Sequence, residues 1–461
     1  MKKKSLLIAT IVLITIGLVP SEMNAQSKRV REQADALQKE ARTAYAQKNY
    51  QVAADKYGQA ITLIPNNPTA HYWKGYAHFE LKEYDPAITS FSLALTQGFK
   101  PPLEIYRVRS FIYSEKKDYN AALADIEKAL VIAPRDLQML KYQGEVHLSR
   151  NAVQQAIEAF QRAAQVAPSD PDIQYNMARA YFVLGNVPAQ KSAAEAALAR
   201  GTRFPGESHY LLADAHQKQG NAAEAILSYQ RAINSKPDIY LAHRNLADVY
   251  RNEARFMDAI ATLRAGLGTF ARDGGFYTDL SWNYSLAGRP KDAVDAANAA
   301  VGLAPDQYAG YTNLCRAYNE TNEFAKAVVA CNKALSLQPG DGETYYYLGN
   351  ALVQQNKSVE ATPMYARAVN GLLEYTRKNP KYSDGWYLLG NASFADLQFD
   401  RAIDAYLKCL TLSPKFLKAR VNLGITYTRK KNKPAAMEQY AFLQTADPAL
   451  AAILKAQIDR M

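Results

Sequence analysis

Small and apolar residues recur along this chain with a period of about 34 residues. Within each period, small residues stand at positions 8 and 20, larger apolar or aromatic residues at positions 7 and 24, and often a proline at position 32. Two antiparallel helices joined by a short turn can approach closely only where the facing side chains are small. The pattern therefore predicts repeated units of helix, turn and helix, which open at residues 34, 68, 103, 137, 171, 206, 240, 274, 308, 342, 383 and 417.

The register is regular along nearly the whole array. Successive units are 34 or 35 residues apart except for one gap of 41 residues, where Val359 to Lys378 is expected to form one long helix. Position 20 is alanine in every unit but the fifth, which has Gln190. Proline at position 32 ends the second helix in eight units, because it lacks an N–H and fixes φ. We expect the units to fill residues 34–450 and residues 451–461 to form a C-terminal capping helix.

These positions resemble the tetratricopeptide repeat, a 34-residue family with small residues at positions 8, 20 and 27, aromatic residues at 11 and 24, and proline at 32. The segment from Trp386 to Pro414 is close to the family pattern, whereas the third, fifth and seventh repeats depart from it. The resemblance implies an all-α fold, a right-handed superhelical α-solenoid of about twelve tandem helix-turn-helix repeats. Since a solenoid grows by addition, the 461 residues are expected to form one long, open domain rather than several globular ones.

The N-terminus has a different pattern. Lys2, Lys3 and Lys4 precede an apolar run from Leu6 to Val19, and a short polar stretch follows. This order is typical of a secretory signal peptide, here residues 1–25, with residues 26–33 as a lead-in to the repeats. An uncleaved membrane anchor is the alternative, but the run is shorter than the roughly 20 residues that span a bilayer. We therefore expect an exported protein, periplasmic or secreted, without a further membrane span.

Charge does not indicate a nucleic-acid partner. The chain carries 55 Lys and Arg against 44 Asp and Glu, a net charge of +11, and removal of residues 1–25 would leave +9. The basic residues are scattered among acidic ones, whereas nucleic-acid binding needs a basic face with stacking platforms. A protein or peptide partner is expected instead, and the oligomeric state stays open.

Candidate chemistry is sparse. The six histidines fall at repeat positions 4 and 11, which normally hold packing aromatics, and no HExxH, GxSxG or phosphate-binding glycine motif occurs. We therefore expect no catalytic residue, no metal and no cofactor. Cys315 and Cys331 occupy facing positions of one repeat. We expect two buried thiols there, with a disulfide as the alternative, because the required Cα separation is narrow and cysteine packs well in a core.

The family resemblance implies that first helices line an inner, concave wall through positions 2, 5, 6, 9, 12 and 13. Aromatic residues among paired charges resemble a protein-binding surface. The candidate groove residues of this kind are Tyr72, Tyr76, Arg107, Tyr175, Arg179, Tyr210, Arg244, Trp282, Arg316, Tyr346 and Tyr387.

Asparagine also recurs on the predicted inner wall. An amide has a donor and an acceptor, so a row of amides can pair with the backbone of an extended peptide. The row is similar to the asparagine ladder in the repeat superhelix of O-linked N-acetylglucosamine transferases; the alternative is bonding within the parent repeat. Its members are Asn176, Asn245, Asn313, Asn350, Asn391 and Asn422.

Two functions fit this sequence. The first is a non-enzymatic protein-protein interaction scaffold of the bacterial cell envelope that holds an extended peptide or a helix of a partner in the concave groove. The second is a structural subunit of an envelope machine, for outer-membrane assembly, secretion, pilus or motility, that contacts folded partners through its convex surfaces. The fold licenses interaction in both cases but does not identify the partner.

Overall fold

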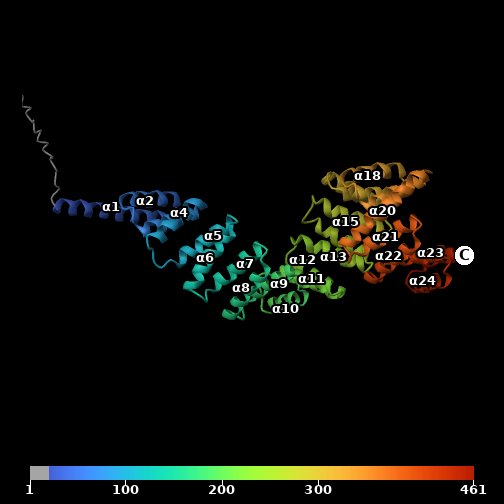
Figure 1. Cartoon of the computed structure of the whole chain (residues 1–461), viewed down its shortest axis with the longest axis horizontal. Helices are drawn as coiled ribbons and strands as arrows, with labels where there is room; N and C mark the ends of the chain where they lie inside the picture. Colours follow the sequence, from blue (N-terminus) through green and yellow to red (C-terminus); the bar gives the residue numbers. More distant parts are fainter. Residues whose placement is uncertain (1–19) are drawn as a thin grey trace, which may run out of the picture. The chain divides into compact units, whose positions relative to one another are not determined.

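A computed structural model describes residues 20–461, with side chains from residue 26 onward. The predicted signal peptide lies outside these residues, apart from the main chain of 20–25. The described part is built of helices α1 to α25 and contains no strand (Figure 1). The all-α fold of tandem helix pairs is therefore confirmed. Among residues 20–461, none of the helices combines the length and the apolar composition required to cross a bilayer.

The chain divides into two compact units, one ending at Leu184 and the other beginning at Gly185. The first unit holds α1 (Pro20–Ala46), α2 (Tyr50–Leu63), α3 (Pro68–Glu80), α4 (Tyr84–Thr96), α5 (Leu103–Glu115), α6 (Tyr119–Ile132), α7 (Leu137–Ser149), α8 (Val153–Val166) and α9 (Pro171–Leu184).

The second unit holds the remaining helices of the array. They are α10 (Val187–Ala199), α11 (Pro205–Lys218), α12 (Ala222–Ser235), α13 (Tyr240–Asn252), α14 (Phe256–Gly266), α15 (Gly274–Leu286), α16 (Pro290–Leu303), α17 (Tyr308–Glu320), α18 (Phe324–Leu337), α19 (Gly342–Gln354), α20 (Ser358–Lys378), α21 (Ser383–Ala395), α22 (Phe399–Leu412), α23 (Leu417–Arg429), α24 (Lys433–Ala446) and α25 (Pro448–Ile458).

The division falls within the fifth repeat, which carries Gln190 where the other repeats have alanine. Gln190 is fully buried, and its amide donates to the carbonyl oxygen of Leu211 at 2.7 Å and to Asp214 Oδ2 at 2.8 Å. Both acceptors lie on α11, so the longer side chain ties α10 to α11 within the second unit. The repeat array thus divides into two compact units at this repeat.

Close helix contact explains why position 8 of the repeats is small. A Cβ atom added to Gly144 would lie 2.4 Å from the ring of Phe160, and one added to Gly390 would lie 2.4 Å from the ring of Tyr406. In each pair the aromatic ring of position 24 therefore rests on the bare backbone of the facing helix. Phe160 and Tyr406 are almost completely buried as a result, which makes these ring-on-glycine contacts part of the core.

Every helix pair turns through one residue in the left-handed conformation, at repeat position 15. Glycine occupies this position in only three repeats; the other nine have Lys48, Lys82, Lys117, Asn151, Ala254, Asn322, Asn356, Leu397 and Lys431. A residue with a side chain costs about 1 to 2 kcal/mol there. The following N–H closes the helix end, as when Asn49 donates to the Ala44 carbonyl oxygen at 2.8 Å. Because the residue types vary, packing of the two helices imposes this turn.

The long helix expected near residue 370 is α20, which has 21 residues against 14 in α18. Its last two turns pack near the start of α19, since a Cβ on Gly371 would lie 2.7 Å from the carbonyl oxygen of Gly340. This extension brings the C-terminal part of α20 to the inner face of the second unit. There it joins the first helices of the repeats.

The second unit closes on itself rather than forming an open coil. The end of α13 meets the segment around α21 and α22, more than 130 residues further along the chain (Figure 1). Ser413 donates to the carbonyl oxygen of Asn252 at 2.6 Å, and Lys415 pairs with Glu253 at 2.6 Å. Leu286 of α15 packs in one cluster with Tyr406, Phe416 and neighbouring residues. We call these interactions the closing contacts; they correct the expectation of an open array.

Candidate functional site

A cavity of about 600 Å³ lies on the inner face of the second unit. Its walls come from the first helices α13, α15, α17, α19 and α21 and from the end of α20. Aromatic side chains stand among charged ones around it. The charged and aromatic lining residues are Arg244, Asp248, Arg251, Asp279, Trp282, Tyr308, Arg316, Asp341, Glu343, Glu374, Tyr375, Lys378, Tyr382 and Asp384.

Two arginines of α13 hold carboxylates of other helices. Arg244 faces Asp279 of α15 through two contacts, Nε to Oδ2 at 2.5 Å and Nη2 to Oδ1 at 3.0 Å. Arg251 lies between Asp248, 2.7 Å from its Nη1, and Asp384, 2.9 Å from its Nε. Because Asp384 belongs to α21, this guanidinium also joins the two ends of the closed array.

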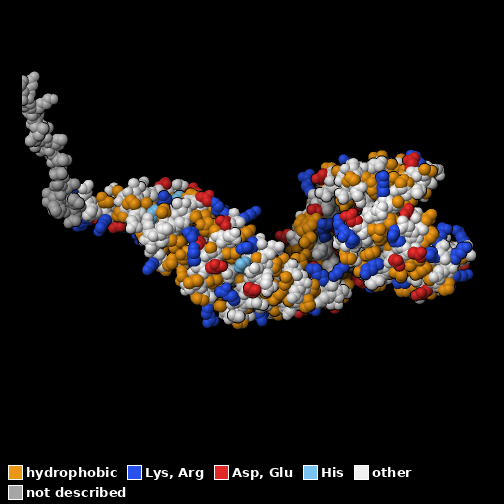
Figure 2. All heavy atoms as spheres, viewed as in Figure 1, with side chains coloured by type: hydrophobic (Ala, Val, Ile, Leu, Met, Phe, Trp, Pro, Cys, Tyr) orange, Lys and Arg blue, Asp and Glu red, His pale blue; other side chains and the backbone are white. Residues whose placement is uncertain are grey.

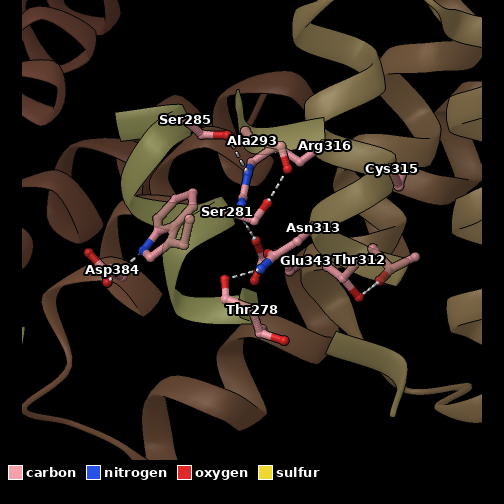
Figure 3. A network of polar contacts seen from close by, with 12 residues as sticks. Thr278, Ser281, Ser285, Ala293, Thr312, Asn313, Cys315, Arg316, Glu343 and Asp384 are labelled. Atoms are coloured by element: carbon pink, nitrogen blue, oxygen red, sulfur yellow. Dashed lines mark hydrogen bonds and ion pairs between the residues drawn. The ribbon is translucent and has the colours of Figure 1, made fainter. Parts of the chain in front are cut away.

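Arg316 of α17 lies at the centre of the network (Figure 3). Its side chain is 1% exposed, and its guanidinium carbon stands 4.1 Å over the ring of Trp282. Nε donates to Ser285 Oγ at 3.2 Å, and Nη1 contacts Glu343 Oε1 at 3.3 Å. Nη2 is buried and has no hydrogen-bond partner among the described residues. One donor group of this desolvated cation is therefore left without an acceptor among the described residues.

Hydroxyl and amide groups fix the helices next to Arg316. Asp341 caps α19 by accepting from the Thr344 N–H at 3.1 Å, and it also accepts from Thr312 Oγ1 at 3.1 Å. The side chain of Asn313 donates to the Thr278 carbonyl oxygen at 2.7 Å, which ties α17 to α15 (Figure 3). These bonds hold the inner faces of three consecutive repeats in place.

Burial shifts the proton equilibria of the cavity carboxylates. It raises the pKa of Glu343 to about 7, and the charges of Asp341 and Asp384 add to the rise, although Arg316 opposes it. Burial also raises the pKa of Asp248, against the effect of Arg251. At neutral pH the cavity therefore holds carboxyl groups that take up protons more readily than in water.

We expect the stability of the second unit to fall as the pH rises from about 4.5 to about 7, because Glu343 ionises freely only in the unfolded chain. One pKa unit corresponds to about 1.4 kcal/mol, and partial solvent access reduces the effect, so Glu343 should account for about 1 to 3 kcal/mol. The check is urea unfolding of the wild type and of Glu343→Gln across this pH range. The difference between the two proteins must change with pH in that window; a constant difference would contradict the shifted pKa.

A second, smaller cavity of about 350 Å³ lies between α19, α21 and α23. It brings together three of the predicted amides. Asn391 Oδ1 accepts from the Tyr406 hydroxyl at 2.8 Å and from Asn422 Nδ2 at 2.9 Å. Asn350 Oδ1 accepts from the Tyr365 hydroxyl at 2.9 Å. The amide donors and acceptors that these bonds leave unused lie along the wall of the cavity.

The other predicted amides also have intramolecular partners. Asn245 donates to the Tyr229 hydroxyl at 3.3 Å, and Asn176 accepts from Arg179 at 3.0 Å. Partners therefore come from the parent repeat in some cases and from the preceding repeat in others. Of the predicted groove residues, the first cavity gathers Arg244, Asn245, Trp282, Asn313 and Arg316, and the second gathers Tyr346, Asn350, Asn391 and Asn422.

The remaining predicted residues take part in packing between helices and line neither cavity. Tyr72 stacks on Phe99 with ring centroids 4.2 Å apart, and Tyr76 meets Phe91 edge to face at 5.3 Å. Further contacts join Arg107 to Asp136, Arg179 to the ring of Tyr175, Tyr210 to Tyr229, and Tyr387 to Phe416.

Sequence reasoning missed most of the cavity carboxylates. Asp279 stands at repeat position 6, and Glu343 and Asp384 at position 2, which are inner-wall positions. The same positional rule that selected the arginines and asparagines would have found these residues. Asp341, at the last position of its repeat, carried no such signal.

The cysteines of the ninth repeat form a disulfide, so the expectation of two buried thiols was wrong. Cys315 of α17 and Cys331 of α18 are bonded, with their Cα atoms 5.2 Å apart. Close approach at positions 8 and 24 brings these Cα atoms within disulfide range. Cys409 is a free, buried thiol.

Within residues 20–461, no group of three or more His, Cys, Asp or Glu side chains is arranged to hold a metal ion. The cavity carboxylates mostly face guanidinium groups. Over the face shown in Figure 2, basic and acidic side chains are interspersed rather than gathered into a single stripe.

Sequence comparisons identify the repeat. Models of the tetratricopeptide repeat match residues 39–101, 175–238, 210–275 and 278–342, and a second such model matches residues 103–136 and 383–416. A TPR repeat model matches residues 144–185. Together these matches extend over most of the array.

Among curated proteins, the chain is similar to an Hsp70-Hsp90 organising protein of Plasmodium falciparum, 26% identical over 165 residues, or 34% of this chain and 27% of that protein. It is also similar to a UDP-N-acetylglucosamine–peptide N-acetylglucosaminyltransferase of Giardia intestinalis, 28% identical over 102 residues, or 22% of this chain and 6% of that enzyme. The chain thus spans 27% or less of the length of these relatives.

Solved structures of similar fold include Cut9 in the APC/C hetero-tetramer Cut9-Hcn1, at 14% identity and a TM-score of 0.41, where 95% of this chain and 98% of that chain are covered. Yeast Tom70 is similar at 13% identity and a TM-score of 0.38, with 93% and 96% covered.

Proposed function

The chain belongs to the tetratricopeptide repeat family, whose members are generally protein-interaction scaffolds, and we therefore propose that it is an exported, non-enzymatic scaffold that binds an extended segment of another protein. The segment would lie against the inner face of the second unit. One observation carries this proposal: the first helices of five consecutive repeats line a single cavity with aromatic and charged side chains. Such surfaces provide both apolar anchors and hydrogen-bonding partners for a peptide.

Three features support binding in the cavity over binding elsewhere. Tyr308, Tyr375 and Tyr382 line it and keep 37%, 42% and 45% of their surface exposed, so they can still contact a guest. Ion pairs and the closing contacts hold its walls, which lowers the entropy that binding must overcome. The second cavity extends the inner face with amides that can pair with a peptide backbone.

Export is part of the proposal. The basic and apolar N-terminal run favours it, and the Cys315–Cys331 disulfide is of a kind that persists in oxidising compartments. N-terminal sequencing of the protein recovered from its native cell tests this point. A chain that begins at Gln26 supports export with removal of the signal peptide, and a chain that begins at Met1 opposes this removal.

The binding proposal predicts that residues at the rim of the cavity matter more than exposed residues that line neither cavity. We expect Tyr308→Ser combined with Tyr375→Ser to remove captured partners, because both rings contact a guest in the cavity. Leu227→Ser combined with Val329→Ser is the matched control, since these side chains are 53% and 70% exposed and line neither cavity. The measurement is quantitative affinity capture from native cells after crosslinking. If only the control pair loses the partners, the protein instead acts as a structural subunit that contacts folded proteins through its outer helices.

A further inference from the structure

We propose that the 600 Å³ cavity of the second unit receives a lysine or arginine side chain from the bound segment, and that Arg316 accommodates a main-chain carbonyl oxygen of the same segment. The inference rests on the proposed scaffold function and adds the chemical class of the residue that is recognised. The charge of the lining, one unsatisfied donor and the exposed rings support it.

The cavity holds more acidic than basic groups. Five carboxylates line it away from the rim, and only three guanidinium groups face them. Glu374 and Lys378 form an additional, exposed pair that is neutral in sum. The inner set therefore carries two carboxylates in excess: Asp248, Asp279, Asp341, Glu343 and Asp384 against Arg244, Arg251 and Arg316.

The excess can be assigned to particular groups. The single guanidinium of Arg251 faces two carboxylates, those of Asp248 and Asp384, so this group of three carries one negative charge in excess. Asp341 has no lysine or arginine partner within the described residues and is held only by N–H and hydroxyl donors. A cation that enters between these acids relieves their mutual repulsion in a partly desolvated space.

Arg316 supplies the second, independent feature. Its Nη2 group is buried without a hydrogen-bond partner, although the residue lines the cavity and is 1% exposed. A buried donor without an acceptor is costly, so a guest that brings an oxygen atom gains the free energy of satisfying it. A guest carboxylate would fit poorly, since it adds a negative charge to a cavity that already has too many. A neutral carbonyl oxygen satisfies the donor without this cost.

The rim suits the aliphatic stem of a basic residue. Tyr308, Tyr375 and Tyr382 present partly exposed rings, and a lysine or arginine packs its methylene groups and its charge against aromatic faces. Protonation also couples to the guest. Since burial raises the pKa of Glu343 to about 7, an entering cation must displace a proton near neutral pH. Binding should therefore strengthen as the pH rises through this range.

The test uses three capped, amidated peptides that differ at one central residue, Arg, Met or Glu, in an otherwise Ala and Ser sequence. Isothermal titration of the full chain at about pH 8 should give at least about tenfold tighter binding of the Arg peptide than of the other two. At about pH 6 the Arg peptide should bind more weakly, and buffers of different ionisation enthalpy should reveal proton uptake by the buffer at about pH 7.

Variants test whether binding depends on the cavity carboxylates or on acidic residues elsewhere on the surface. Glu343→Gln and Asp341→Asn should each reduce binding of the Arg peptide about tenfold, while Glu360→Gln, an exposed position of α20 outside the cavity, should leave it unchanged. Circular dichroism confirms that each variant is folded, and the proton-linkage measurement on the wild type stands without any variant. Equal binding of the three peptides, tighter binding of the Glu peptide, or no binding at millimolar peptide overturns the basic-guest proposal. A different result contradicts the scaffold function itself: the protein with Tyr308→Ser and Tyr375→Ser would still capture its partners.

Discussion

Replacing Arg251 by alanine will lower the free energy of unfolding of the second unit by about 3 to 5 kcal/mol. The Arg251 side chain is 7% exposed and stands between Asp248 and Asp384. Without it, Asp248 and Asp384 face each other with no guanidinium between them, although burial and the charges of Asp279 and Asp384 already raise the pKa of Asp248. The loss also removes an ion pair between α13 and α21, which belong to opposite ends of the closed array. Urea unfolding followed by circular dichroism measures the change.

Arg255→Ala is the matched control for this prediction. Arg255 lies four residues further along the chain, just before α14, pairs with Asp258 at 2.7 Å, and leaves 49% of its side chain exposed. A surface pair of this kind contributes about 0 to 1 kcal/mol. Adding Asp248→Asn and Asp384→Asn to an Arg251→Met protein should recover much of the lost stability, because this cluster of three residues then holds no charge. Equal losses at Arg251 and Arg255 would contradict the closed arrangement.

Removing the disulfide with Cys315→Ala and Cys331→Ala should cost about 3 kcal/mol of stability. The bond joins residues 16 apart in sequence, so it restricts a loop of moderate length in the unfolded chain. Both cysteines are fully buried between α17 and α18, and alanine fills their places with little rearrangement. Thermal unfolding of the double variant and of the wild type, both without reductant, gives the difference.

The free thiol provides the comparison. Cys409→Ala should cost less than the double change, because it removes only the packing of one buried sulfur atom. A strong reductant should lower the melting temperature of the wild type and of Cys409→Ala, and it should leave the double variant unaffected. A wild-type protein that melts at the same temperature with and without reductant would show that the bond makes no contribution.

The fold could be predicted from the sequence because its determinants are local and repeated. A small residue at position 8 is needed wherever an aromatic ring of position 24 covers the backbone, as at Gly144 beneath Phe160. Because this requirement recurs in each repeat, the pattern can still be recognised on both sides of the irregular fifth repeat. The long helix α20 could likewise be predicted, because the one 41-residue spacing between repeats contains an uninterrupted helical stretch.

The candidate site was less accessible to prediction, since it depends on angles that accumulate over many repeats. No local pattern states that Asn252 will meet Ser413, because the small rotation between neighbouring repeats must be summed across about five of them. The disulfide posed a similar problem on a smaller scale: the facing positions of its cysteines were clear, but the 5.2 Å between their Cα atoms was not. The inner-wall positions themselves followed the repeat, which is why Arg316 and Asn313 could be named in advance.

The closing contacts have a consequence for how this protein can evolve. In a linear array, a duplication or deletion of one whole unit only lengthens or shortens the rod, because each unit touches its neighbours alone. Between α13 and α21 the chain instead forms a loop whose two ends must meet, so the number of units within it is fixed by geometry. Gene variants that change the repeat number should therefore be tolerated before this loop and excluded inside it.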